Sequence, residues 1–303
     1  MKIRFLSAVC ALTLSLNAFS EDFSREVTFD SGAIGAKAET VDTFDGVAGR
    51  TTFSTAFPRP LADGTDPQHV MMTIKEGETG WGVWGGAMNF RKNLYKGDTF
   101  WASFHMYVPD DFQFYAAGNG ALKFLRIRTR ASAADGVGGF NDFQIMDDPS
   151  FNGSVYRFIK EGAAGRGWKY IGTKDQKDEL LPRNKWFKVE ISLRFDSVPV
   201  SEGGLAYFKL WIDNKLVWDG KDVQTLTSSG DWADSLYFFT YWNGKAPKTQ
   251  SLYIDNIVMK SSVDAAELRP QDRDADGNLY IGEKGNPSAL YKSPPSRVEA
   301  TIQ

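Results

Sequence analysis

The 303-residue chain carries 35 basic and 38 acidic side chains, a formal net charge of −3. This slightly acidic balance argues against nucleic acid as a partner, and two histidines with one cysteine argue against a zinc site. Nine Trp, 11 Tyr and 22 Phe are compatible with two roles, the core of a large β protein and flat faces for stacking on sugars.

Residues 1–20 predict a secretory signal peptide. Lys2 and Arg4 precede a short apolar run, Phe5–Leu16, and Ala18–Ser20 offers small residues at the cleavage positions. The mature chain would begin near Glu21 without any cysteine, and loss of two basic residues leaves 33 basic against 38 acidic ones, a net charge of −5. We therefore expect an exported bacterial protein, secreted or periplasmic, with no membrane-spanning segment.

Strand-like alternation dominates the rest of the chain. Phe100–Val108 alternates between apolar residues and a second face that carries Trp101 and His105. The other expected strands, in chain order, are Leu122–Arg130, Asn141–Ile145, Val155–Lys160, Phe187–Phe195, Ala206–Ile212, Leu216–Trp218, Leu236–Trp242 and Leu252–Lys260. One short helix is expected at Asp264–Leu268. Many short strands separated by turns predict one all-β sandwich or barrel over residues 21–262, followed by a tail at 263–303.

The strand Leu122–Arg130 is the most informative for function. Its alternation places Arg126, Arg128 and Arg130 on one face, with Leu125 and Ile127 pointing into a core. Planar guanidinium groups match carboxylate or sulfate, so this face could bind an acidic polymer. The alternative is a solvated face whose arginines pair with nearby Asp and Glu, and the pattern does not decide between the two.

Several motifs of the second half resemble the concanavalin A-like jelly rolls, a group that includes lectins, glucanases and polysaccharide lyases. These motifs are Asn184–Trp186, the turn Ser201–Gly204, Leu210–Leu216 and Tyr253–Ile257. The resemblance covers roughly residues 25–262 and implies a sandwich of two antiparallel sheets, a jelly-roll β-sandwich. Such a fold hosts many chemistries.

Three further motifs look most like jelly-roll polysaccharide lyases that act on uronate polymers. They are Gly80–Gly86, Leu122–Arg130 and Tyr241–Gly244. The chain lacks the Arg-Ser/Thr-Glu-x-Arg and Gln-x-His strands of those enzymes, which leaves catalysis less well supported than the fold. The resemblance implies an acidic polysaccharide as the partner, bound on the concave sheet of a monomer, and no organic cofactor.

β-Elimination requires a group that neutralises the uronate carboxylate and groups that move protons. We expect Arg126 to neutralise the carboxylate, with help from Arg128, Gln144 and Asn243. The candidates for proton transfer, in order, are Tyr241, His105 and Lys160. Further candidates for sugar binding are Arg130, Trp84, Trp101 and Tyr156. Each aromatic or histidine candidate could instead be a packed structural residue.

Other activities have less support in the sequence. A retaining jelly-roll glycosidase would carry a Glu-x-Asp-x-(x)-Glu strand, and a serine hydrolase of the common type would carry a Gly-x-Ser-x-Gly elbow; neither is present. Two alternatives to a lyase remain open: a carbohydrate-binding protein without catalysis, and an envelope protein whose arginine face packs against a protein partner.

Calcium is the one cofactor that the sequence suggests. The loop Asp272–Glu283 fits D-x-D-x-D-G-x5-E. Its expected ligands are Asp272, Asp274, Asp276, Asn278 and Glu283. Pro270 and the segment 284–287 would block the flanking helices of an EF-hand, so a plain surface turn is the alternative. The jelly-roll resemblance implies a second structural calcium at Asp30 and Asp255, where the first strand meets the last.

Overall fold

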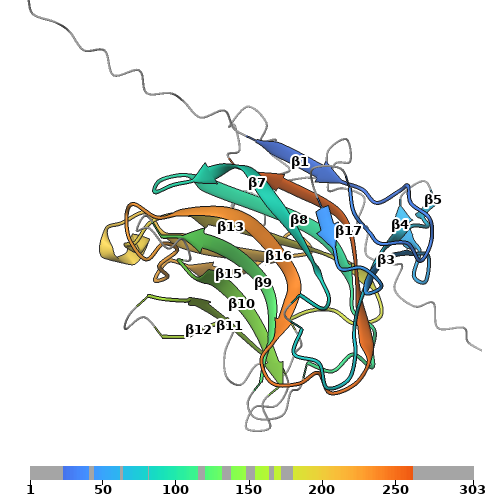
Figure 1. The fold of residues 1–303 in the computed structure, drawn as a ribbon. Coiled ribbons are helices and arrows are strands. Elements are labelled where there is room, and N and C mark those ends of the chain that lie inside the picture. Colours follow the sequence, from blue (N-terminus) through green and yellow to red (C-terminus); the bar gives the residue numbers. More distant parts are fainter. Residues whose placement is uncertain are drawn as a thin grey trace, which may run out of the picture.

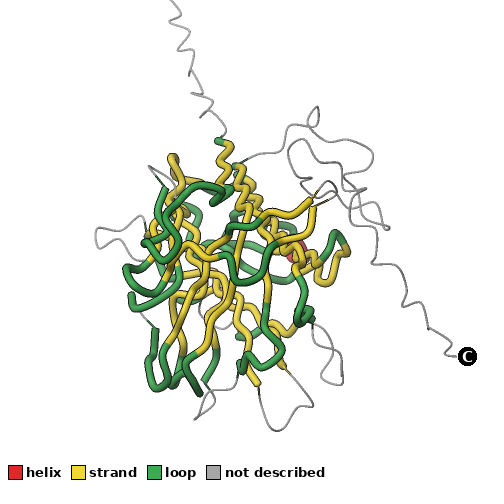
Figure 2. The backbone as a smooth tube through the Cα atoms, turned by 90° about the vertical axis from the view of Figure 1, so that its right-hand side faces the viewer, coloured by secondary structure: helices red, strands yellow, loops and turns green. Residues whose placement is uncertain are grey.

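The computed structural model describes residues 23–40, 44–61, 64–80, 82–114, 120–131, 138–147, 154–163, 167–171 and 180–261. The expected signal peptide, the helix at 264–268 and the loop at 272–283 lie outside these residues. The described residues form β-strands, turns and one 3-10 turn, η1 (Val200–Glu202), as Figure 2 shows. Among them, no helix has the length and apolar composition needed to span a membrane.

Two large antiparallel sheets make up the fold (Figure 1). The eight-stranded sheet runs, in spatial order, β15 (Lys215–Gly220), β14 (Tyr207–Ile212), β13 (Trp186–Arg194), β8 (Thr99–Tyr107), β17 (Gln250–Lys260), β6 (His69–Ile74) and β3 (Thr51–Ser54), with β1 (Ser24–Val27) paired to β17. The seven-stranded sheet runs β12 (Lys169–Ile171), β11 (Ser154–Lys160), β10 (Phe140–Asp147), β9 (Leu122–Arg130), β16 (Trp232–Trp242), β7 (Gly86–Leu94) and β2 (Phe44–Gly46). A separate hairpin joins β4 (Arg59–Leu61) and β5 (Gly64–Asp66).

The core lies between the inner faces of the two sheets. Phe104 of β8 and Phe238 of β16 meet across this gap edge to face, with ring centroids 5.2 Å apart. Leu125 and Ile127 of β9 point into the same core, as their alternation predicts. The stacked, largely apolar inner faces confirm the expected all-β jelly-roll sandwich.

A β-bulge in the seven-stranded sheet changes which residues face outward. Phe124 and Leu125 are consecutive in β9, yet both are buried in the core, and the register of β9 shifts against both neighbouring strands at this point. In β16 the irregularity includes Phe239, whose φ of 52° lies in the left-handed region. The bulge turns Lys123 outward, onto the same face as Arg126.

Candidate functional site

One row of side chains crosses the outer face of the seven-stranded sheet. Its members lie opposite one another on consecutive strands, in the order Tyr241, Lys123, Gln144, Arg157 and Tyr170. Neighbouring strands are about 4.8 Å apart, so the row is roughly 19 Å long. The next row on this face places Tyr237 opposite Arg126, and Arg126 opposite Asp142. The outer face thus carries polar and aromatic side chains along a line perpendicular to the strands, of which Lys123 and Gln144 are only 8% and 1% exposed.

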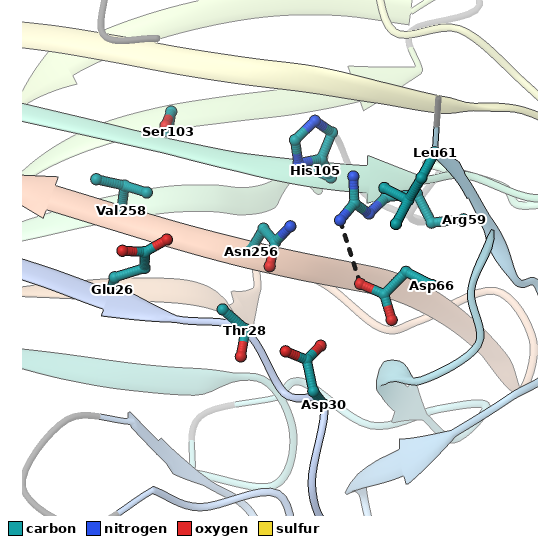
Figure 3. Close-up of a pocket in the computed structure, with 10 residues that line it drawn as sticks. All are labelled: Glu26, Thr28, Asp30, Arg59, Leu61, Asp66, Ser103, His105, Asn256 and Val258. Carbon is teal, nitrogen blue, oxygen red and sulfur yellow. Dashed lines mark hydrogen bonds and ion pairs between the residues drawn. The ribbon is translucent and has the colours of Figure 1, made fainter. Parts of the chain in front are cut away.

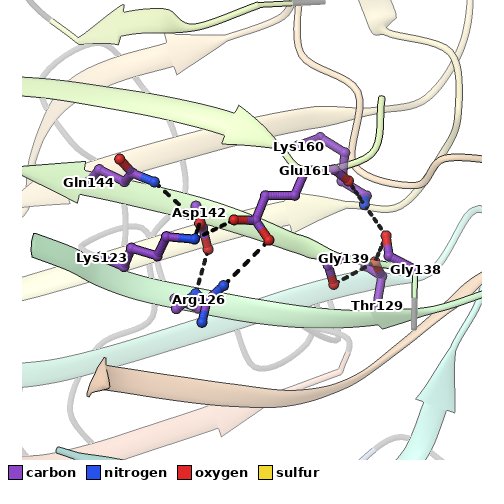
Figure 4. Close-up of polar contacts among 9 residues, drawn as sticks. All are labelled: Lys123, Arg126, Thr129, Gly138, Gly139, Asp142, Gln144, Lys160 and Glu161. Atoms are coloured by element: carbon purple, nitrogen blue, oxygen red, sulfur yellow. Dashed lines mark hydrogen bonds and ion pairs between the residues drawn. The ribbon is translucent and has the colours of Figure 1, made fainter. Parts of the chain in front are cut away.

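Asp142 is the centre of an ion-pair network at this face (Figure 4). Its carboxylate is fully buried and accepts hydrogen bonds from Arg126 Nε at 2.7 Å and Gln144 Nε2 at 3.3 Å. Lys123 Nζ lies 3.0 Å from the Oδ2 atom of Asp142 and also donates to Glu161. Arg126 Nη2 lies 3.4 Å from Glu161. Two cations and two carboxylates therefore hold one another in place.

Glu161 is the carboxylate of this network that remains partly accessible, with its side chain 31% exposed. Burial, together with the negative charge of Asp142, raises the pKa of the Glu161 carboxyl above its ordinary value. A carboxyl group with a raised pKa can exchange protons at a pH closer to neutrality. Glu161 follows β11 directly, in the turn that leads away from the sheet.

Tyr241 lies beside the two cations of the network. Lys123 Nζ is 5.2 Å from the centre of the Tyr241 ring, and the Arg126 guanidinium carbon is 5.8 Å from it. The two rows place Tyr241, Arg126 and Gln144 on one face of the seven-stranded sheet, and their roles in binding or catalysis stay predictions.

The three arginines of β9 do share a face, but each is paired with a carboxylate. Arg126 is 3% exposed and bound to Asp142, so its expected display toward solvent is wrong. Arg128 binds Asp234 through Nε and Nη2, at 2.6 and 3.0 Å, and Arg130 Nε donates to the same carboxylate at 2.9 Å. Arg128 and Arg130 remain partly exposed, at 23% and 31%.

Cations outnumber carboxylates among the charged side chains named here on this face. Lys123, Arg126, Arg128, Arg130 and Arg157 are five cations, and Asp142, Glu161 and Asp234 are three carboxylates, so these eight side chains carry a net charge of +2. Protonation of Glu161 would raise this to +3. The surplus contrasts with the net charge of −3 of the whole chain and favours an anionic ligand at this sheet.

His105 and Trp101 lie on the other sheet, so their expected place beside the arginines is wrong. Both belong to β8, in the eight-stranded sheet, and their side chains point away from the core. Trp101 stacks on Trp211 with ring centroids 5.7 Å apart. Sequence alternation gives the face of a strand but not the sheet to which the strand belongs, and the outer faces of the two sheets point in opposite directions.

Three other candidates are structural residues. Trp84 is fully buried and stacks on Trp242, and Tyr156 is buried against Phe143; neither ring can stack on a sugar. Lys160 shares the inward face of β11 with Tyr156 and donates hydrogen bonds to the backbone carbonyls of Gly138 and Glu161 (Figure 4). Burial lowers the pKa of Lys160 to about 8, but its amine is held below the sheet surface.

Asn243 lies where β16 ends, two residues after Tyr241. Its backbone N–H donates to the carbonyl of Ala121 at 2.8 Å, directly before β9 begins. The residue is therefore fixed at the same end of the row as Tyr241 and Lys123. A contact between its side-chain amide and a substrate stays a prediction.

A pocket of about 250 Å³ lies on the outer face of the eight-stranded sheet, under the β4–β5 hairpin (Figure 3). Asp30 and His105 line it, whereas the buried Asp255 accepts a hydrogen bond from Arg59 Nε at 2.8 Å. The Arg59 guanidinium thus already occupies an oxygen of Asp255, which does not fit a shared calcium with Asp30. Among the described residues, no three His, Cys, Asp or Glu side chains lie close enough together to hold a metal ion. Calcium at 272–283 stays a prediction.

Sequence reasoning missed Lys123, Asp142 and Glu161. A strict alternation puts Lys123 on the same face as Leu125 and Ile127, and only the bulge at Phe124 moves it outward. Asp142 could have been found from the sequence, because it lies two residues before Gln144 in β10 and its side chain therefore points to the same polar face. The position of Glu161 could not be predicted from its neighbours in the sequence, because it lies in a turn whose direction is set by the packing of the sheet.

Comparison with known proteins shows the fold. No protein-family model matches the chain, and no curated protein matches its sequence. The alginate lyase Aly36B superposes with a TM-score of 0.55 at 14% identity, over 78% of this chain and 96% of that one. A double variant of the same lyase in complex with an alginate trisaccharide gives a TM-score of 0.56 at 13% identity, over 79% and 98%. The chain thus has the jelly-roll fold that this polysaccharide lyase also has.

Proposed function

We propose that the protein is a polysaccharide lyase that cleaves a uronate-containing polysaccharide by β-elimination on the outer face of the seven-stranded sheet. The observation that carries this proposal is the row in which Tyr241, Lys123 and Gln144 lie side by side on a face with surplus positive charge. The fold shared with an alginate lyase supports it.

β-Elimination removes the proton from the carbon next to the uronate carboxylate and breaks the glycosidic C–O bond, leaving a ring C=C bond. Negative charge accumulates on the carboxylate oxygens as the proton leaves, so nearby positive charge and hydrogen-bond donors lower the barrier. A proton must also reach the departing glycosidic oxygen. The site therefore needs charge stabilisation and at least one group that moves protons.

The residues of the row meet these needs. Lys123 and Arg126 provide positive charge close to the bound carboxylate, and Gln144 provides an amide beside them. Tyr241 is the group that moves the proton, since it lies next to both cations. Glu161 is a second acid–base group because its pKa is raised and its side chain is partly exposed. An export signal at 1–20 would bring the enzyme to extracellular polymers.

The direct test is incubation of the purified protein with alginate, glucuronan, ulvan and glycosaminoglycans. We expect ultraviolet absorbance from unsaturated product on at least one of these polymers. Tyr241→Phe should abolish product formation while the variant still binds the polymer, because the ring and its cation contacts remain. Absence of product on all four classes of polymer would contradict the lyase proposal.

A carbohydrate-binding protein without catalysis is the second candidate. The observation that favours it is the near-complete burial of Arg126 and Lys123 in ion pairs with Asp142 and Glu161, which is typical of structural rather than catalytic charges. Such a protein would bind the same polymers with salt-dependent affinity and release no product. Tyr241→Phe would then leave its function intact.

A further inference from the structure

The pocket under the β4–β5 hairpin combines buried polar side chains with exposed carboxylates (Figure 3). Its walls come from β1 and the segment that follows it, from β4, β5, β8 and β17. It opens on the outer face of the eight-stranded sheet, which is the side of the sandwich opposite to the candidate site. Its volume of about 250 Å³ is room for roughly eight water molecules, or for an organic ligand of about as many non-hydrogen atoms.

The charge of this pocket is opposite to that of the candidate site. Three carboxylates and one guanidinium line it, which gives a net charge of −2, and the pocket stays negative even when its histidine is protonated. The guanidinium belongs to Arg59, which is 3% exposed and binds Asp66 and Asp255. The other two carboxylates, those of Glu26 and Asp30, are exposed and form no ion pair with a described residue. The pocket therefore favours a cation over a uronate.

Two neutral polar groups of the pocket also lack a hydrogen-bond partner within the described part of the chain. Ser103 is 4% exposed and lines the pocket, and its hydroxyl bonds to none of the described residues. Asn256 lines the same pocket, at the β-bulge of β17, and its Oδ1 atom accepts no hydrogen bond. A buried acceptor without a donor is unfavourable, so these two groups favour a ligand that carries N–H or O–H donors.

The arrangement suits an organic cation better than a metal ion. Calcium requires six to eight oxygen atoms that converge on one point, whereas no three His, Cys, Asp or Glu side chains of the described residues lie close enough together to hold a metal ion. Leu61 and Val258 add apolar surface to the wall. Separate carboxylates, neutral acceptors and apolar side chains match ammonium groups joined by a chain of methylene groups, because each ammonium group presents three donors and the methylene groups pack against apolar surface.

We propose that this pocket binds a small organic diamine. One ammonium group contacts the exposed carboxylates of Glu26 and Asp30, and the other amino group donates to Ser103 and Asn256. The methylene chain contacts the apolar part of the wall, and the two positive charges of the ligand match the net charge of −2 of the lining residues. The two outer faces of the sandwich thus bind ligands of opposite charge, and this inference does not depend on the proposed lyase activity.

Calorimetric titration of the purified full chain with putrescine, at low salt, tests the proposal. We expect one putrescine to bind per chain, butylamine to bind more weakly because it carries a single charge, and glucuronate not to bind in the pocket. Glu26→Gln and Asp30→Asn should each raise Kd for putrescine about fivefold, and Ser103→Ala should also raise it. Glu76→Gln is the matched control, because it removes an exposed carboxylate two residues beyond β6, and it should bind as wild type does.

The possible results distinguish the pocket from general attraction of amines. Absence of putrescine binding at millimolar concentration would overturn the proposal. So would equal weakening by Glu26→Gln and Glu76→Gln, because the net charge of the chain rather than the pocket would then hold the amine. Calcium chloride that binds at one site, is weakened by Asp30→Asn and meets no competition from putrescine would assign the pocket to a metal instead. An active lyase that binds no diamine, or an inactive protein that binds it, would separate this inference from the proposed function.

Discussion

Replacement of Asp142 by asparagine tests the ion-pair network most directly. The Asp142 carboxylate is fully buried and contacts Arg126 at 2.7 Å and Lys123 at 3.0 Å. An amide of the same shape keeps the packing but removes the charge. Both cations would keep their contacts with Glu161, which lies on the partly exposed side of the network.

The expected cost lies at the lower end of the cost of a fully broken buried pair. Leaving a buried charge without its partner costs about 3–5 kcal/mol. Asp142 contributes to the raised pKa of Glu161, so its loss lets Glu161 ionise more readily and replace part of the missing charge. We therefore expect a loss of about 3 kcal/mol, which for a domain of this size lowers Tm by roughly 6–12 °C.

Urea unfolding of wild type and Asp142→Asn measures this difference, with an unchanged slope showing that the same surface is exposed on unfolding. Asp111→Asn is the control: Asp111 pairs with Lys248 at an exposed position, and such pairs contribute about 0–1 kcal/mol. If Asp142→Asn unfolds within about 1 kcal/mol of wild type, the two cations do not depend on the carboxylate, and the network is not what holds them.

Three further predictions concern single groups. Tyr241→Phe should lower the lyase rate by at least about 100-fold with unchanged binding in calorimetry; a retained rate would remove Tyr241 from the chemistry. Binding of polyuronate should weaken as pH rises through the raised pKa of Glu161, because the ionised carboxylate cancels one positive charge, and calorimetry on Glu161→Gln should show a flatter profile. Burial raises the pKa of Asp255 from 3.8 to about 8. Wild-type stability should therefore fall as pH rises across that range, since the folded state keeps a proton that the unfolded chain releases. Asp255→Asn should reduce this slope in urea unfolding, and an equal slope in both proteins would contradict the shift.

Several long strands were predictable from alternation alone, whereas β7, with nine residues, was not expected. Leu122–Arg130 was expected and observed with identical bounds, and β8, β13 and β17 agree with their expected ranges to within two residues. Each has at least nine residues, so its alternation is sampled several times. The three-residue strands β2, β4 and β12 offer too few positions for a period to be seen, and β4 contains Pro60, which argues against a strand.

The candidate site was predictable only in part, for two physical reasons. Alternation correctly placed Arg126 and Gln144 on outward faces, opposite in parity to the core residues Ile127 and Phe143, whereas Tyr241 was a candidate because of its motif. Alternation failed for Lys123, where a single extra residue at Phe124 reverses the parity. It also failed for His105, because β8 and β9 follow one another in the chain yet belong to different sheets.

A lyase and a carbohydrate-binding protein would use the same positive charge on this face, and they differ in whether a side chain moves protons. The surplus positive charge of the outer face attracts a polyuronate whether or not the protein cleaves it, so salt-dependent binding cannot distinguish a lyase from a binding protein. Buried cations can stabilise the developing negative charge only if a neighbouring group removes the proton. In the described part of the face, Tyr241 and Glu161 are the accessible groups that contact those cations. Catalysis must therefore be sensitive to Tyr241→Phe or Glu161→Gln, whereas binding alone need not be.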